Sequence, residues 1–229
     1  MARAGEQSYN PVQKDWIVFR ETAQDTRGQL MSAEIVFSPH GGNPLHVHPN
    51  QEEHFKVLSD TLGVQIGEEH RSLGEGEEAT VPPGTPHRLS NAQDEEVRIL
   101  GEVRPALNTE TFLETLYGLA RDGRTDKSGV PNLLQFAVML DGLHKVEIYL
   151  AKPPIAFQMA LFGLLSPAGK VLGYEEHYPK YSEEVGTAGV EGAGPPSKTS
   201  VIARGATMAT SLLVASLFLL GRMRRRSKG

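Results

Sequence analysis

The chain has 229 residues, which suits one domain with appended segments, and it has no cysteine, which excludes disulfides, cysteine-ligated zinc sites and thiol catalysis. Its formal net charge is −5, and five of its 23 basic residues lie in the last nine positions, so the remainder is strongly acidic. We expect no nucleic-acid partner, because binding phosphates requires clustered Lys and Arg on the folded body.

Short strands separated by turns dominate the first hundred residues. The polar segment 1–14 comes first and is predicted to be disordered. Alternating or β-branched runs then predict strands at 16–19, 30–37, 46–48, 53–57, 61–66, 69–73, 79–81, 88–90 and 97–103. Many short strands at this spacing indicate a sandwich or barrel, which we place at residues 15–105.

The pattern changes from strand to helix after Pro105. Apolar residues at helical intervals predict a helix over 110–120, with Thr109 as its N-cap. A second helix is expected from Pro131 to about 140, and a third from about 154 to 165 or beyond. They make up a predicted helical extension over residues 106–184, which we expect to pack on the barrel or on a second copy in a homodimer.

Candidate metal ligands lie on two of the predicted strands. Residues i and i+2 of a strand face the same side, so His46 and His48 can present their imidazoles together. Alternation along 53–57 places Glu53 among apolar neighbours, and this favours Glu53 over Glu52 as a ligand. A buried carboxylate needs a partner, and a metal is a suitable one.

A third imidazole comes from His87, which follows the stiff, turn-rich segment 82–86. Three imidazoles and one carboxylate suit one divalent Fe, Mn, Ni, Cu or Zn ion and leave coordination positions open, whereas Ca and Mg prefer oxygen ligands. The remaining histidines are interpreted as structural or surface residues: His40, His54, His70, His144 and His177.

These residues resemble the two motifs of the cupin superfamily. The second motif, Gly-x5-Pro-x-Gly-x2-His-x3-Asn, is matched at every fixed position, by Gly76, Pro82, Gly84, His87 and Asn91. The first motif is matched at its ligands, but Gly41 lies one residue too close and Asp60 replaces the last glycine. Both departures fall on turns. The resemblance implies a mainly β, jelly-roll cupin barrel in which His46, His48, Glu53 and His87 bind the metal.

The resemblance covers about residues 9–181. The segments 103–107 and 112–123 are similar to those of cupin type-2 domain proteins with a C-terminal helical extension, a group without a settled activity. The barrel is therefore expected to be followed by helices of the same polypeptide.

The last segments predict a membrane anchor. Residues 185–200 are rich in small residues and proline, and are predicted to be a flexible linker. Residues 205–221 lack charge, and with 201–204 they are long enough for a transmembrane helix, since a helix rises about 1.5 Å per residue and the hydrocarbon core is about 30 Å thick. A basic tail, 222–229, follows.

This pattern predicts a single-pass, tail-anchored membrane protein with a cytosolic cupin domain. The orientation stays open, because basic residues favour the cytoplasmic side. A C-terminal helix docked on the protein is the alternative.

Three functions remain open at this stage. The first is a metal-dependent oxygenase or isomerase-like enzyme that acts on a small chelating substrate. The second is a non-catalytic cupin that binds a small molecule at a membrane. The third is a partner-docking module with a structural metal. No separate general base is evident, so no catalytic residue is assigned, and no residue is assigned to an organic cofactor.

Overall fold

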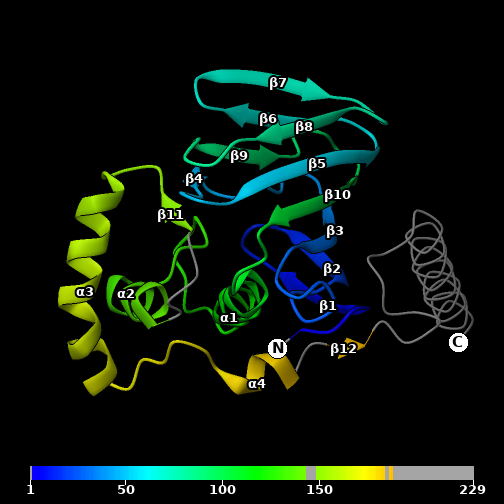
Figure 1. Cartoon of the computed structure of the whole chain (residues 1–229). Helices are drawn as coiled ribbons and strands as arrows, with labels where there is room; N and C mark the ends of the chain where they lie inside the picture. The colour runs from blue at the N-terminus through cyan, green and yellow to red at the C-terminus, as the bar shows by residue number, and fades with distance from the viewer. Residues whose placement is uncertain (1, 143–147, 184–185, 188–229) are drawn as a thin grey trace, which may run out of the picture. The chain divides into compact units, whose positions relative to one another are not determined.

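The computed structural model describes residues 2–142, 148–183 and 186–187. Its strands form two antiparallel sheets (Figure 1). The larger sheet has the order β12-β1-β2-β3-β10-β5-β8, with β1 Glu6–Asn10, β2 Asp15–Glu21, β3 Met31–Phe37, β5 Glu52–Ser59, β8 Glu78–Val81, β10 Val97–Arg104 and β12 Gly186–Thr187. The smaller has the order β11-β4-β9-β6-β7, with β4 His46–Val47, β6 Leu62–Ile66, β7 Glu69–Leu73, β9 His87–Ser90 and β11 Tyr149–Leu150.

Side-chain alternation buries one face of the strands, as the sequence predicts. Along β5, Glu53, Phe55 and Val57 are buried while Glu52 is exposed. Phe55 and Val57 belong to an apolar cluster that includes side chains of the smaller sheet, such as Leu62 and Leu89. The mainly β, cupin-like part of the predicted fold is confirmed.

The prediction that residues 1–14 are disordered is wrong for 6–10. These residues form β1, which pairs antiparallel with β2 from Gln7↔Val18 to Asn10↔Asp15. The polar side chains of this strand are buried because the helical extension covers them, and Arg121 donates to the Ser8 hydroxyl at 2.6 Å. Polarity alone therefore underestimates order, since tertiary partners can satisfy buried polar groups.

Four helices follow in the described residues: α1 Thr109–Arg121, α2 Leu133–Gly142, α3 Ile155–Val171 and α4 Pro179–Glu183. The three predicted helices are confirmed, whereas α4 was not predicted. The predicted cap is wrong: Asn108 occupies the N-cap without a side-chain bond, and the Thr109 hydroxyl donates to the Ala106 carbonyl at 2.7 Å.

The helical extension shares a hydrophobic core with the larger sheet. Phe112 of α1 and Phe136 of α2 belong to the same buried cluster as Ile17 of β2 and Met31 of β3. β11, which was also not predicted, adds Tyr149 to this cluster and pairs with β4. In Figure 1, α1 and α2 lie below β4, β5 and β9 and to the left of β1, β2 and β3, and α3 lies at the left edge. The helical extension therefore covers the buried face of the larger sheet.

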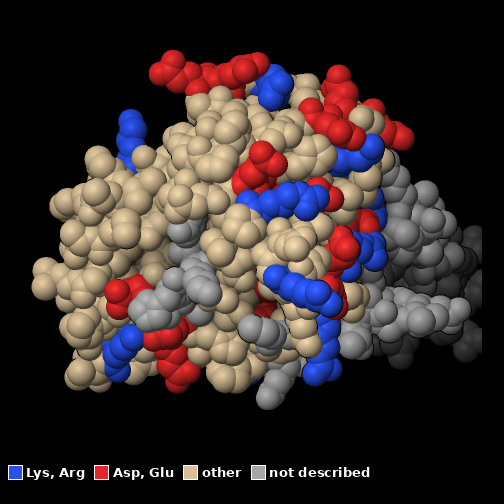
Figure 2. All heavy atoms as spheres, viewed as in Figure 1, with Lys and Arg blue, Asp and Glu red and all other residues tan. Residues whose placement is uncertain are grey.

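Charged residues are unevenly spread over the face in Figure 2. Acidic and basic side chains lie side by side over the sheets, while the region at the left is mostly uncharged. On this side α3 exposes large apolar side chains, including Phe157, Met159 and Leu164.

No helix among the described residues is long and apolar enough to span a bilayer. The predicted membrane helix, 201–221, and the basic tail, 222–229, lie outside those residues. So does the predicted linker, 185–200, apart from residues 186–187, which form β12 and pair with β1.

Candidate metal centre

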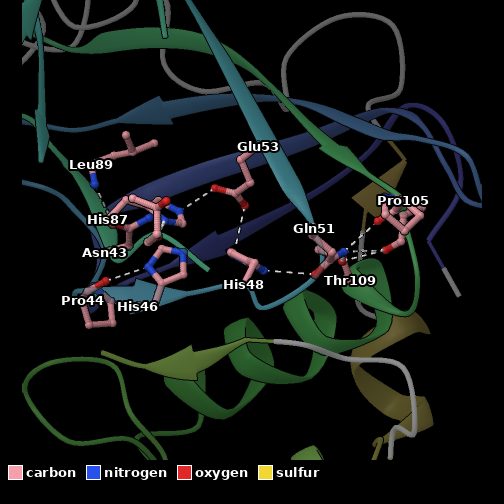
Figure 3. Close-up of polar contacts among 12 residues, drawn as sticks. Asn43, Pro44, His46, His48, Gln51, Glu53, His87, Leu89, Pro105 and Thr109 are labelled. Carbon is pink, nitrogen blue, oxygen red and sulfur yellow. Dashed lines mark hydrogen bonds and ion pairs between the residues drawn. The ribbon is translucent and has the colours of Figure 1, made fainter. Parts of the chain in front are cut away.

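The structure brings all four predicted ligands together (Figure 3). His46 on β4 is the register partner of His87 on β9. His48 is the residue directly after β4, and Glu53 lies on β5. One potential ligand atom from each of these residues lies within 4.8 Å of all the others. The four residues therefore form a cluster that could hold one metal ion, although the binding itself stays a prediction.

The second ring nitrogen of each histidine is held by an acceptor. Nδ1 of His46 and Nδ1 of His87 lie 2.9 and 3.0 Å from the carbonyl oxygen two residues earlier in the chain. Nδ1 of His48 lies 3.1 Å from Oε1 of Gln51. Carbonyl oxygens only accept, so each Nδ1 carries a proton and each Nε2 of a neutral ring keeps its lone pair. Orientation through the opposite nitrogen is typical of metal-ligating histidines.

Glu53 draws two of these Nε2 atoms toward itself. Its Oε2 lies 2.8 Å from Nε2 of His87, and its Oε1 lies 3.2 Å from Nε2 of His48. Nε2 of His48 is buried and has no hydrogen-bond partner. Lone pairs that face one another at this distance require a cation between them, either a proton or a metal. The donor set therefore fits a transition-metal ion.

The electrostatics of the cluster favour a cation. Burial, reinforced by the neighbouring histidines, lowers the pKa of His46 to about 3. Burial would raise the pKa of Glu53, but the positive charge that His48 carries when it is protonated and the hydrogen bond from Nε2 of His87 hold this pKa well below its usual value. Burial likewise opposes protonation of His87, yet the hydrogen bond and charge of Glu53 raise its pKa. A carboxylate and a neutral imidazole are the forms that bind a metal.

Gln51 connects the cluster to the helical extension. Its Nε2 donates to the Pro105 carbonyl at 2.8 Å and lies 3.0 Å from the Thr109 hydroxyl oxygen. With the amide nitrogen engaged there, Oε1 is left to accept from His48. Sequence reasoning missed this residue, since glutamine is a common surface residue and only the tertiary structure buries it.

An apolar cavity of about 120 Å³ adjoins the cluster, and His46, His48 and Glu53 line it. Its wall combines the buried face of the larger sheet with side chains from α1, α2 and β11. Asp15 and Tyr117 also line it, and neither was predicted as a site residue. Strand alternation could have predicted that Asp15 is buried, because Asp15 precedes Ile17 by two positions and so lies on the same buried face of the strand.

The other described histidines lie outside the cluster. His40 and His54 are near acidic side chains, at 3.4 Å from Asp94 and 3.4 Å from Glu78. His177 contacts Ser182, and His70 is an exposed residue of β7. His144 lies outside the described residues.

The comparisons with known proteins agree with this fold. A family model described as a cupin domain matches residues 33–101. A curated protein of Arthrobotrys oligospora named an oxidoreductase is 30% identical over 62% of this chain, and a probable oxidoreductase of Hypocrea virens is 28% identical over 75%. The chain spans 60% of the first relative's length and 78% of the second's.

Among solved structures, an RmlC-like cupin from Shewanella frigidimarina is 16% identical to the chain. It covers 45% of this chain, which in turn covers 86% of it, with a TM-score of 0.40.

Proposed function

Because this chain belongs to the cupin superfamily through residues 33–101, we propose that it is a metal-dependent enzyme acting on a small chelating substrate. The observation that carries the proposal is the cluster of three imidazoles and one carboxylate beside an apolar cavity. Four protein donors leave positions for substrate on an ion that takes five or six ligands. A closed structural site would have little use for an adjoining cavity.

The chain's own residues would hold the ion and shape its surroundings. His46, His48 and His87 would bind through Nε2, and Glu53 would bind through its carboxylate. When bound, the ion supplies Lewis-acid or redox chemistry to an oxygen-bearing substrate. The apolar wall excludes water, which strengthens electrostatic interactions inside the cavity.

An oxygenase and an isomerase-like enzyme could both use this donor set. The two curated relatives are named as oxidoreductases, which supports the redox version with Fe as the first metal to test. A non-catalytic protein that only binds the small molecule is the alternative, and the cavity is equally compatible with it.

A spectroscopic titration tests whether the bound metal has an open position. The full-length protein, purified in detergent and stripped of metal, would be loaded with Co²⁺ and titrated with azide. We expect a saturable change in the visible spectrum at one Co²⁺ per chain. An unchanged spectrum would mean a coordinatively closed, structural metal. Oxygen uptake by the Fe²⁺-loaded protein that depends on an added candidate substrate, which supplies the electrons, then separates an oxygenase from a binding protein.

We also propose that residues 201–221 anchor the protein in a membrane. The support is the uncharged sequence of residues 205–221 within this segment and the basic residues that follow it. The cupin domain would then work at a membrane surface, where apolar substrates concentrate.

A further inference from the structure

A second polar site faces the cavity from α1 and β2. Asp15, the first residue of β2, is 3% exposed, and its Oδ2 accepts a hydrogen bond from the hydroxyl of Tyr117 on α1. Its other oxygen, Oδ1, is buried and has no hydrogen-bond partner in the described part of the chain. Both residues line the cavity, whose wall also includes His46, His48 and Glu53.

An unsatisfied buried carboxylate oxygen requires an explanation. Leaving such an acceptor without a donor costs on the order of 1–3 kcal/mol or more, so native structures rarely do it. Burial raises the pKa of Asp15 to about 7, although the hydrogen bond from Tyr117 partly opposes this. The carboxylate is thus held at a site where a donated hydrogen bond would stabilise its charged form.

The position of the unpartnered atom points to a ligand. Several described residues carry buried side-chain atoms without a hydrogen-bond partner, but only two of those residues line the cavity. One is His48, through the Nε2 that the metal would occupy, and the other is Asp15, through Oδ1. Two unmet polar atoms in one mainly apolar wall are expected of a binding site, where few polar groups fix the ligand's orientation.

We propose that the cavity binds a mainly apolar small molecule that bears a hydroxyl group, and that this hydroxyl donates to Oδ1 of Asp15. A separate oxygen group of the same molecule would meet the metal, and this half of the inference rests on the proposed function. The body of the ligand would contact apolar side chains that include Ile17, Ile35, Phe55, Phe112, Leu116 and Phe136. Aromatic or alicyclic hydroxy acids have this combination of groups.

Tyr117 is a positioning residue in this scheme. Its hydroxyl engages Oδ2, which leaves Oδ1 to interact with the ligand. Because Tyr117 belongs to α1 and Asp15 to β2, the hydrogen bond also joins the helical extension to the barrel. The extension thereby contributes to ligand selection as well as to the cavity wall.

The test compares aromatic acids that differ in one hydroxyl group. Full-length, metal-loaded protein in detergent would be titrated with 6-hydroxy-2-naphthoate, 2-naphthoate and 6-methoxy-2-naphthoate, and with the one-ring analogues 4-hydroxybenzoate, benzoate and 4-methoxybenzoate. A hydrogen bond to a charged acceptor is expected to favour the hydroxy compound by about tenfold or more in Kd in at least one series. The methyl ethers cannot donate a hydrogen bond, so the unaltered protein should bind them no more tightly than the acids without a hydroxyl group.

Variants assign the preference to Asp15. Asp15→Asn should reduce the preference for the hydroxy compound to about threefold or less in Kd, since the charged acceptor is lost. Tyr117→Phe should also reduce this preference. Asp94→Asn, the same change at a side chain that is 97% exposed, should leave it intact. The proposal is overturned if the unaltered protein shows no preference in either series, if the ethers bind as tightly as the hydroxy compounds, or if Asp15→Asn retains the full preference.

A further variant separates this inference from the proposed function. His87→Ala should weaken the binding of both members of each hydroxy and hydroxyl-free pair, because the metal end is lost, while the preference between them persists. If both members bind as tightly as before, the proposed contact between the ligand and the metal is contradicted, while the proposed hydrogen bond to Asp15 is unaffected. Loss of the preference in Asp15→Asn at unchanged metal content would support Asp15 independently.

Discussion

At the scale of single residues, the orientation of His48 depends on an amide that the helical extension holds in place. Gln51 accepts from Nδ1 of His48, while its nitrogen donates to the Thr109 hydroxyl of α1 and to the Pro105 carbonyl just before the helical extension. Replacing such an outer partner commonly costs about 10–100-fold in metal affinity. Gln51→Leu is therefore expected to weaken metal binding by that factor, measured by competition with a chelator, at an unchanged stoichiometry.

Gln93→Leu is the matched control for this experiment, because Gln93 is exposed and lies outside the cluster. Equal affinities of the two variants would show that the hydrogen bond from His48 has no influence on the metal.

Asp15 gives a prediction about stability and pH. Its pKa in the folded chain is about 7, above the usual 3.8. Between pH 3.8 and pH 7, the Asp15 carboxyl is therefore protonated in the folded chain but ionised in the unfolded chain. The contribution of Asp15 to the free energy of unfolding is therefore fully present below pH 3.8 and is lost as the pH rises through 7. Asp15→Asn mimics the protonated form, so its Tm relative to the unaltered protein should rise from pH 4 to pH 8. A relative Tm that is constant over this range would contradict the pKa.

The site residues differ in how far the sequence could predict them. His46, His48 and His87 follow from motif spacing, and parity along β5 correctly favoured Glu53 over Glu52 for burial. Asp15 has the same kind of parity signal, but a polar first residue of a strand is ordinarily exposed. Its burial depends on α1, which is distant in the sequence, and no local pattern contains that contact.

At the scale of elements, close packing between α1 and α4 restricts one glycine. A Cβ at Gly118 would lie 2.1 Å from the Tyr181 ring, which is fully buried. Overpacking of this kind typically costs about 1–3 kcal/mol, and in a chain of this size each kcal/mol lowers Tm by roughly 2–4 °C. Gly118→Ala should therefore lower the Tm measured by circular dichroism.

Gly163 in α3 provides the control, because its added Cβ would meet only Oδ1 of Asp141, at 3.9 Å. Gly163→Ala should be neutral or stabilising by about 0.5–1 kcal/mol, as alanine favours a helix. Equal destabilisation by both substitutions would argue against the contact between α1 and α4.

Elements with a strong local period were the predictable ones. The apolar spacing in α1, α2 and α3 predicted these helices, whereas the five-residue α4 and the two-residue β11 are too short to have a period. β1 was missed because its burial comes from β2 and from the helix that covers it. Thr109 was expected to cap α1, but its hydroxyl instead binds Ala106, which is a local competition that spacing does not reveal.

At the scale of the whole molecule, the barrel and the helical extension share one hydrophobic core and one cavity wall. The motifs predicted the barrel and the four candidate metal ligands, yet they contained nothing about a cavity between the two parts. Such a cavity depends on long-range packing of α1 and α2 against the larger sheet. The ligand would therefore be selected by both parts of the chain.

The membrane proposal makes its own prediction at this scale. Deleting residues 201–229 should move the protein from the membrane pellet to the supernatant after ultracentrifugation of lysed cells, because the uncharged segment is removed. Full-length protein should stay in the pellet after a carbonate wash. Continued sedimentation of the shortened protein with membranes would contradict the anchor and direct attention to the exposed apolar side chains of α3.

Metal content tests the central claim most directly. The full-length protein should bind one transition-metal ion per chain by elemental analysis, and His87→Ala should lose most of it. His70→Ala, which removes an exposed histidine of β7, should keep the full content. Equal metal in the His87→Ala and unaltered proteins, both folded by circular dichroism, would contradict the assignment of His46, His48, Glu53 and His87 as a metal centre.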